Sequence, residues 1–293
     1  MERLSNESIV EYKQHLLRMF ADFIRICDEN GLQWCCAGGT LLGAIRHKGF
    51  IPWDDDIDVF MPRADYNRLI SIEAKLHSSG YGVISMNNHT AGATFAKFWD
   101  MRTTLWELGE VPFVYGVYID LFPLDYTNLA QKQFVRRYKQ RRVLNTLYQL
   151  SLMRVRPTML SDRIKEGDKK IIVKDFLQFL VPRFLTPWIR KWMIKADTMG
   201  QQSSGLALAS WYGDYWEREY LRKEWFDSFI DGTFERLKVK LPCGYDKYLS
   251  ALYYDYMQLP PEEMQVSHHY HYFLDLERHL SIDQIKRIKK ESR

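Results

Sequence analysis

Residues 54–58 contain four aspartates, and the chain runs from them directly into an apolar stretch. In a β-strand, side chains alternate between two faces, so Asp56 and Asp58 would share one face while Ile57 and Val59 enter the core. Two adjacent carboxylates raise each other's pKa, and a bound divalent cation removes that repulsion. Carboxylate oxygens suit a hard ion, so the run predicts a strand that binds Mg²⁺ or Mn²⁺.

Two other structures produce acidic runs of this kind. One is a solvated turn, which is disfavoured because apolar residues follow the acids at once. The other is a calcium-binding EF-hand loop, in which Asp54, Asp56 and Asp58 would fill positions one, three and five. That loop needs Gly at its sixth position and Glu at its twelfth, where this chain has Val59 and Asp65. The EF-hand interpretation therefore fails, and a metal-binding strand is favoured.

The segment before the acids predicts a strand, a tight turn and a helix. Residues 33–37 read as a short buried strand whose cysteines are core thiols, Gly38 and Gly39 break it, and residues 40–46 read as a short helix. A Gly pair at such a turn lets backbone N–H groups approach a phosphate closely. Thr40 either caps the helix or contacts the phosphate.

A metal site of this kind needs a third carboxylate, for which Asp120 is the best candidate. It lies in the apolar run 116–122, where an ionised carboxylate is unfavourable unless it is paired, hydrogen-bonded or metal-bound. Asp125 follows closely after Pro123. We expect it to open a loop or to cap a helix that begins near Leu129.

Together these segments resemble the LicD family. The resemblance spans roughly residues 8–126 and 210–270, and residues 127–205 carry no family signature. The chain departs from the family at Tyr254, where a Gly is usual. The matching segments are 38–47, 49–59, Arg63, 65–66, 119–125, 242–249 and 255–262, with His268 and His269 beyond them.

The resemblance implies a nucleotidyltransferase-type fold and transfer of a phospho-alcohol, typically phosphocholine from CDP-choline, onto a hydroxyl of teichoic acid, lipopolysaccharide or capsule. Fukutin-type relatives transfer ribitol phosphate from CDP-ribitol instead. The Gly turn of the superfamily maps onto Gly38 and Gly39. Its three catalytic, metal-binding acids map onto Asp56, Asp58 and Asp120. The last of these either completes the metal site or accepts the proton of the acceptor hydroxyl.

Several other residues are candidates for substrate binding. Arg46 and Lys97 are candidates for phosphate contacts, the alternative for each being a solvated surface charge. Lys97 lies in a strand-like alternation, so its side chain should emerge on the polar face. His268 and His269, together with Asp55, are candidates for substrate contact, although a histidine pair near a C-terminus is otherwise structural or exposed.

Composition limits the alternatives. The 293 residues carry a net charge of +4, which permits an anionic substrate and does not indicate nucleic acid. An amphipathic helix is expected over residues 7–30, closed by Gly31. We expect no signal peptide, no membrane span and no zinc site, because long apolar runs and paired cysteine spacing are missing from the sequence. The chain is expected in the cytoplasm, and a lipid-linked acceptor would bring it to the inner face of the membrane.

The central region reads as helical, basic and aromatic. Arg or Lys residues stand among apolar residues at helical spacing in segments 134–142, 171–181 and 184–192. Such helices either pack on the sheet as a subdomain, which is the favoured interpretation, or lie at a membrane interface. Residues 200–205 predict a flexible boundary.

These observations predict an α/β (α+β) fold, a nucleotidyltransferase-like mixed sheet flanked by helices with a helical insert. The expected divisions are a catalytic core over residues 1–126, the insert over 127–205 and a C-terminal segment over 206–293 that completes the substrate site. The predicted activity is metal-dependent phospho-alcohol transfer from a CDP-alcohol donor to a glycan acceptor. The alternatives are a nucleotidyltransferase that releases pyrophosphate and a non-catalytic glycan- or nucleotide-binding protein, against which the retained acids argue.

Overall fold

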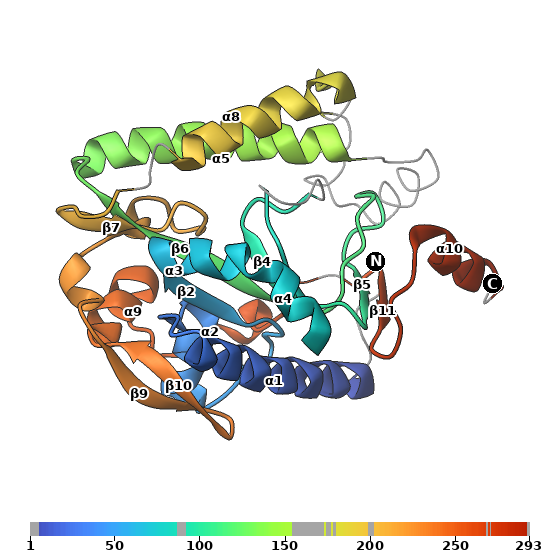
Figure 1. Cartoon of the computed structure of the whole chain (residues 1–293). Coiled ribbons are helices and arrows are strands. Elements are labelled where there is room, and N and C mark those ends of the chain that lie inside the picture. The colour runs from blue at the N-terminus through green and yellow to red at the C-terminus, as the bar shows by residue number, and fades with distance from the viewer. Residues whose placement is uncertain are drawn as a thin grey trace.

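The computed structural model describes residues 6–86, 92–153, 173, 177, 180–198, 202–267, 269 and 271–291. Helices flank a mixed β-sheet, which confirms the predicted α/β class (Figure 1). The strands are β1 (Cys35–Cys36), β2 (Asp58–Pro62), β3 (Tyr81–Ile84), β4 (Ala96–Asp100), β5 (Thr104–Trp106), β6 (Tyr118–Thr127), β7 (Ala207–Ala209), β8 (Tyr220–Leu221), β9 (Phe229–Phe234), β10 (Leu237–Pro242) and β11 (Phe273–Asp275). The helices are α1 (Asn6–Glu29), α2 (Gly38–Leu42), α3 (Arg63–Ser71), α4 (Glu73–Leu76), α5 (Gln131–Leu152), α8 (Thr186–Thr198), α9 (Tyr245–Tyr253) and α10 (Ile282–Glu291).

The main sheet has the strand order β1-β2-β6-β4-β3, and β7 and β8 extend it beyond β6. Strands β2 and β6 run parallel, whereas β1 with β2, β4 with β6 and β3 with β4 are antiparallel. The long strand β6 pairs with β2, β4 and β7, so it connects both halves of the sheet. Two smaller pairs, β9 with β10 and β5 with β11, lie outside this sheet.

The predicted N-terminal helix is confirmed as α1, and Gly31 follows it in the left-handed region at φ +59°. Its apolar face enters the core through Phe20 and Phe23, which are fully buried. Both rings contact Trp34 edge-on, with centroids 5.5 and 5.7 Å away, and Phe23 also contacts Phe98 of β4 at 5.4 Å. This aromatic cluster joins the helix to the sheet that carries the acidic run.

The acid-bearing strand begins later than predicted. Strand β2 starts at Asp58, and Asp56 lies just before it. The backbone N–H of Asp120 nevertheless donates to the carbonyl of Ile57 at 2.9 Å, so pairing with β6 extends one residue beyond the strand. Ile57 and Val59 are fully buried, as the alternation predicts.

The helix after the Gly pair begins earlier than predicted. Helix α2 starts at Gly38, with Ala37 as its N-cap, and continues into a π-helical turn over Gly43–His47. The N-cap interpretation of Thr40 is therefore wrong, because that residue lies inside the first turn. Its hydroxyl accepts a hydrogen bond from the backbone N–H of Asp58 at 2.8 Å, which ties the helix to β2.

The prediction for Asp125 was also wrong. This residue lies within β6, is fully buried, and accepts two hydrogen bonds from Arg63 of α3, at 2.7 and 2.6 Å. Arg63 also donates to Asp197 of α8, which accepts a further hydrogen bond from Arg141 of α5 at 3.0 Å. A buried carboxylate needs such paired donors. This ion network joins the sheet to the two helices of the insert.

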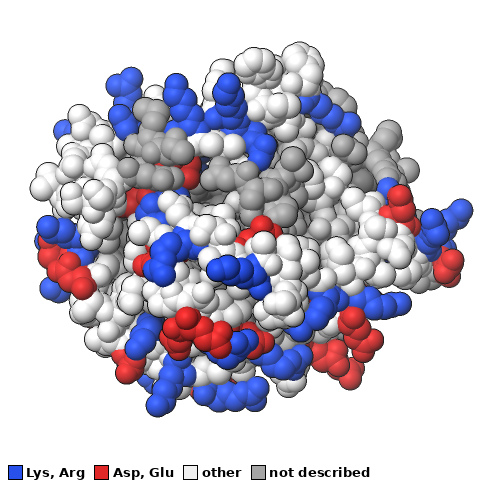
Figure 2. Space-filling view, viewed as in Figure 1, with Lys and Arg blue, Asp and Glu red and all other residues white. Residues whose placement is uncertain are grey.

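Helices α5 and α8 lie side by side along one edge of the molecule, which confirms helical structure in the central region (Figure 1). Most of segment 171–181 and residues 200–201 lie outside the described residues, so the boundary at 200–205 and the division into three segments stay predictions. Lys and Arg side chains line the edge formed by α5 and α8 in Figure 2. Within the described parts of the chain, no helix combines the length and the apolar character needed to cross a bilayer.

Replacing Arg63 with Met should destabilise the protein by roughly 3–5 kcal/mol, because it leaves Asp125 buried without its partner. Urea denaturation would measure the change. Arg68→Met is the matched control: Arg68 pairs with Asp65 while 56% of its side chain is exposed, so its loss should change stability by less than about 1 kcal/mol. Equal stability of the two variants would contradict the assigned role of the network.

Candidate active site

The sheet register brings the predicted acids together. Asp58 of β2 stands directly opposite Asp120 of β6 in the parallel pair. Lys97 of β4 stands opposite Asp120 in the antiparallel pair, and its Nζ lies 2.7 Å from Oδ1 of Asp120. Directly opposed residues of neighbouring strands share a face of the sheet. The three side chains therefore form one charged row across β2, β6 and β4.

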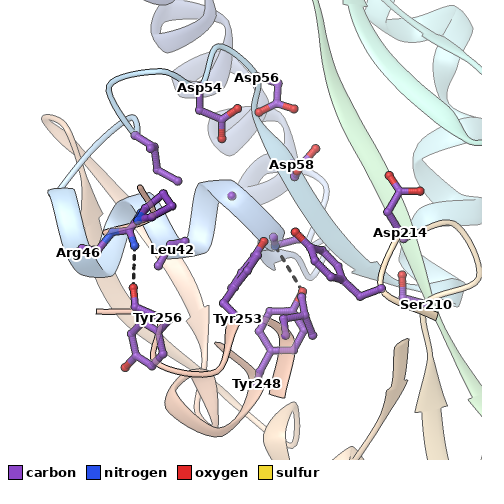
Figure 3. A pocket seen from close by; sticks show the side chains of 18 of the residues that line it. Leu42, Arg46, Asp54, Asp56, Asp58, Ser210, Asp214, Tyr248, Tyr253 and Tyr256 are labelled. Carbon is purple, nitrogen blue, oxygen red and sulfur yellow. Dashed lines mark hydrogen bonds between the residues drawn. The ribbon is translucent and has the colours of Figure 1, made fainter. Parts of the chain in front are cut away.

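These acids line a cleft of about 860 Å³ beside the sheet. In Figure 3, Asp54, Asp56 and Asp58 run along one side of the cleft, with Arg46 at one end of the view and Asp214 at the other. The predicted site residues that line the cleft are Gly38, Gly39, Arg46, Asp56, Asp58, Asp120 and His269. His268 lies outside the described residues.

Three other candidate residues lie behind the residues that line the cleft. Among the described residues, Thr40, Lys97 and Asp55 do not line the cleft, and each contacts a residue that does. Thr40 accepts the N–H of Asp58, as described above. The Nζ of Lys97 also lies 3.4 Å from the ring centroid of Tyr118, so this cation is held between a carboxylate and an aromatic face. The structure thus gives each of these three a contact that positions a cleft residue.

The Gly pair leaves room for the acids. Gly38 adopts φ +44°, and a Cβ on it would lie 3.2 Å from Oδ2 of Asp58. A Cβ on Gly39 would lie 2.6 Å from Oδ2 of Asp54, closer than real Cβ atoms approach. The backbone N–H of Gly38 donates to the hydroxyl of Tyr248 at 3.4 Å. Side chains at this turn would push the carboxylates apart.

The carboxylates resist ionising together. Burial raises the pKa of Asp58 well above its ordinary value, and the charges of Asp56 and Asp120 raise it further. Burial also raises the pKa of Asp56, and it raises that of Asp120 against the opposing charge of Lys97. Burial and the charge of Asp56 raise the pKa of Asp54 to about 8. Any cation that enters the cleft would stabilise the ionised form of these carboxylates.

His269 supplies part of the missing positive charge. Its Nδ1 lies 2.8 Å from Oδ1 of Asp55, and its Nε2 lies 3.4 Å from Oδ2 of Asp56. Ser267 also donates to Asp55, at 3.1 Å. Burial would lower the pKa of His269, but the hydrogen bond to Asp55 and the nearby acidic charges raise it to about 10. The ring is therefore protonated at neutral pH and bridges two of the aspartates.

The residues of the cleft fit a hard divalent cation. Oδ1 of Asp56 is buried and has no hydrogen-bond partner among the described residues, so this oxygen is available as a ligand. Among the described residues, the group of three whose ligand atoms lie within 4.8 Å of one another is Asp54, Asp55 and His269, not the predicted Asp56, Asp58 and Asp120. His269 and Asp55 are paired with each other and Asp55 also accepts from Ser267, so this group would have to release those contacts, and the imidazole its proton, to bind a metal.

Arg46 connects the cleft to the C-terminal segment. Its Nη1 donates to the carbonyl of Tyr256 at 2.7 Å and to that of Gln258 at 3.2 Å. Its Nε donates to His47 at 2.9 Å. The guanidinium lines the cleft while these bonds hold it in place. Arg46 thus closes one end of the cleft with chain from residues 256–258.

The sequence analysis missed several residues of the lining. Asp54 lies in the acidic run itself, two residues before Asp56. That position is the sequence signal that could have identified it as a lining residue. The remaining lining includes an aromatic and acidic group, Tyr212, Asp214, Tyr215, Glu219, Tyr253 and Tyr254. The rings of Tyr215 and Tyr253 meet edge-on with centroids 5.2 Å apart. No local pattern marks these residues, because the fold brings them to the acids from far along the chain.

Comparison with known proteins agrees with this geometry. A family profile described as "LicD/FKTN/FKRP, nucleotidyltransferase domain" matches residues 31–155. The chain is 31% identical over 252 residues to the lipopolysaccharide cholinephosphotransferase LicD of Haemophilus influenzae, covering 84% of this chain and 90% of that protein.

Two rickettsial proteins of uncharacterised function match shorter stretches. One, from Rickettsia prowazekii, is 33% identical over 86 residues, which is 27% of this chain and 32% of that protein. The other, from Rickettsia typhi, is 32% identical over 68 residues, or 23% and 22% of the two chains. The near full-length match to the Haemophilus protein determines the assignment. The chain belongs to the LicD family of phosphotransferases.

Proposed function

We propose that this chain transfers phosphocholine from CDP-choline to a hydroxyl of lipopolysaccharide or a related cell-surface glycan, and that the reaction needs Mg²⁺ or Mn²⁺. The relative named for cholinephosphotransfer to lipopolysaccharide supports the group and the acceptor. The observation that carries the proposal is the row of Asp58 and Asp120 on adjacent strands, with Asp56 beside it, in one cleft. Phosphoryl-type transfer depends mainly on positioning and charge neutralisation, which this arrangement can supply.

In this proposal Asp56 and Asp58 hold the cation. Asp120 either joins them or accepts the proton of the acceptor hydroxyl, and Lys97 keeps its carboxylate in place. Bound there, the cation would neutralise the diphosphate and stabilise the departing CMP. His269, held by Asp55, adds a fixed positive charge beside Asp56.

The distribution of charge along the cleft supports one orientation of the donor. Arg46 lies at one end, where its guanidinium can bind phosphate oxygens of the CMP half. Asp214 and Glu219 lie among the tyrosines of the lining. Asp214 pairs with Arg142, and burial raises the pKa of Glu219 to about 7, so the aromatic faces are the main attraction for a quaternary ammonium here. They suit choline better than an uncharged alcohol such as ribitol or glycerol.

The reaction then follows from these positions. The acceptor hydroxyl attacks the phosphorus that bears choline, and the bond from that phosphorus to the bridging oxygen breaks. CMP leaves with the electron pair, and the hydroxyl proton passes to a carboxylate of the cleft, for which Asp120 is the candidate. The products are CMP and the phosphocholine-substituted glycan. A nucleotidyltransferase would release pyrophosphate instead, so product analysis separates the two activities.

Asp58→Asn should lower CMP release from CDP-choline at least about 100-fold, because it removes a carboxylate proposed to hold the cation that neutralises the diphosphate. The variant should unfold at the same temperature as the parent or higher, since the amide relieves repulsion at a site where the pKa is raised. Asp231→Asn on β9, where 79% of the side chain is exposed, is the control and should keep full activity. Activity of Asp58→Asn near that of the control would remove the proposed site.

Tyr215→Leu should raise KM for CDP-choline roughly 2- to 30-fold, the range expected for loss of one cation–π contact. Tyr215→Phe keeps the ring and should stay near the parent value. Inhibition by CMP, which lacks choline, should be the same in all three proteins. Equal KM in the Leu and Phe variants would show that this ring does not contact the choline group.

Without a divalent cation, stability should fall as pH rises. Asp54 has an ordinary pKa near 4 and a folded pKa of about 8, so its contribution to stability is present below about pH 4 and is lost as pH rises to about 8. In EDTA, Tm should therefore drop by a few degrees between pH 5 and 8. Mn²⁺ should reduce that drop, and Asp54→Asn should flatten it, whereas Asp231→Asn should follow the parent. Identical slopes for all three proteins in EDTA would contradict the assigned repulsion.

A further inference from the structure

Helix α8 has apolar residues on two sides. Its inner side carries Ile189 and Met193, which are buried in a cluster with Tyr148, Leu150 and Leu152 of α5. This packing accounts for the inner side as the contact of a helical subdomain. It does not account for the exposed apolar residues on the outer side of α8 and in the short 3₁₀ turn Arg183–Leu185 that precedes the helix.

The outer side presents three large rings to solvent. Phe184, Trp188 and Trp192 are 74%, 60% and 57% exposed, and they follow one another at intervals of four residues. Residues four apart lie on the same face of an α-helix, so Trp188 and Trp192 share one face of α8; together with Phe184 of the preceding turn they are here called the aromatic stripe. Aromatic side chains of this size are normally buried, and an exposed row of them marks an interaction surface.

Basic residues outnumber acidic ones on the described elements that carry the aromatic stripe and pack beside it. The turn Arg183–Leu185, α8 and α5 together contain ten lysines and arginines, and Asp197 is their sole acidic residue. Two of the ten have acidic partners: Arg141 shares Asp197 with Arg63, and Arg142 pairs with Asp214. Arg183 and Lys191 are exposed next to the rings. Figure 2 shows the Lys and Arg side chains along this edge.

We propose that the aromatic stripe is a membrane-binding surface that lies on an anionic bilayer, with its rings at the level of the headgroups and its basic residues against lipid phosphates. Trp, Phe and basic residues on one helix face are the composition of an interfacial helix. Basic residues near an anionic surface strengthen such binding. A second copy of the chain fits less well, because a symmetric interface would place the same basic surface against itself.

Hydrogen bonds connect the helix that carries the aromatic stripe to the cleft. Asp197 of α8 accepts a hydrogen bond from the hydroxyl of Tyr212, and Tyr212 lines the cleft. Arg63 donates a hydrogen bond to the same carboxylate and another to Asp125 of β6. Binding of α8 to a bilayer would therefore hold the cleft at a fixed position relative to the lipid surface, where a lipid-linked glycan can reach it.

Co-sedimentation with vesicles tests this surface. The full chain should bind vesicles of phosphatidylcholine with phosphatidylglycerol, and it should bind vesicles of phosphatidylcholine alone much more weakly. Trp188→Ser with Trp192→Ser should lower partitioning about tenfold or more. Lys191→Glu should lower it about fivefold or more. Added salt should weaken binding of the parent, and its tryptophan emission should shift to the blue with anionic vesicles.

Ile230→Ser on β9 and Lys238→Glu on β10 are the matched controls, being an exposed apolar residue and an exposed lysine away from α8, and both should bind as the parent does. CMP release with a soluble acceptor should be unchanged in every variant, so the result stands apart from the proposed reaction. Equal vesicle binding by the stripe variants and the parent would overturn the proposal. So would failure of the parent to bind anionic vesicles, or sedimentation as a dimer that the stripe variants abolish.

Discussion

The parallel pairing of β2 with β6 is the contact on which the site depends. It sets Asp58 opposite Asp120, and the antiparallel pairing of β4 on the far side of β6 adds Lys97 to the same row. A shift of one residue in either register would turn one member of the row to the opposite face. The apolar residues on either side of Asp58 and Asp120 in the chain are buried, so the hydrophobic core fixes the register. They are Ile57, Val59, Ile119 and Leu121.

Like charges held this close destabilise a fold, and the structure opposes them with cations from distant segments. Lys97 contacts Asp120, and His269 bridges Asp55 and Asp56 across more than two hundred residues of sequence. Burial raises the pKa values of Asp54, Asp56 and Asp58, and neighbouring carboxylates raise them further, so the acids resist ionising together. In the proposed function, a divalent cation bound with the diphosphate would allow these carboxylates to ionise together, which would explain why such an arrangement persists.

Local patterns predicted the parts of the structure that short segments determine. The alternation around Ile57, the Gly pair and the amphipathic first helix each appear in a few consecutive residues, and each was found nearly where it was expected. Asp125 was misjudged because its environment comes from Arg63, a tertiary partner on another element. Element boundaries at Asp58 and Gly38 moved for the same reason, since pairing partners rather than local propensity end a strand or start a short helix.

The sequence predicted that a C-terminal segment over residues 206–293 completes the substrate site, but not which of its residues line the cleft. Its tyrosines and acids carry no spacing that signals a site, and they meet the aspartates through β7, β8 and α9 packing beside the sheet. The contacts of α8 with α5 agree with the subdomain interpretation of the central region, and the membrane-interface interpretation stays a proposal. Helix α8 packs against α5 with one side and presents Trp188 and Trp192 to solvent with the other.

The most direct test of this account is to locate Mn²⁺ by its anomalous scattering in crystals grown with the metal and a non-reactive CDP-choline analogue. We predict an ion within about 2.0–2.3 Å of carboxylate oxygens of Asp56 and Asp58, with the diphosphate on its other side and Asp120 facing the same cleft. An ion held by Asp54, Asp55 and His269 instead, or an Asp120 carboxylate turned away from the diphosphate, would contradict it.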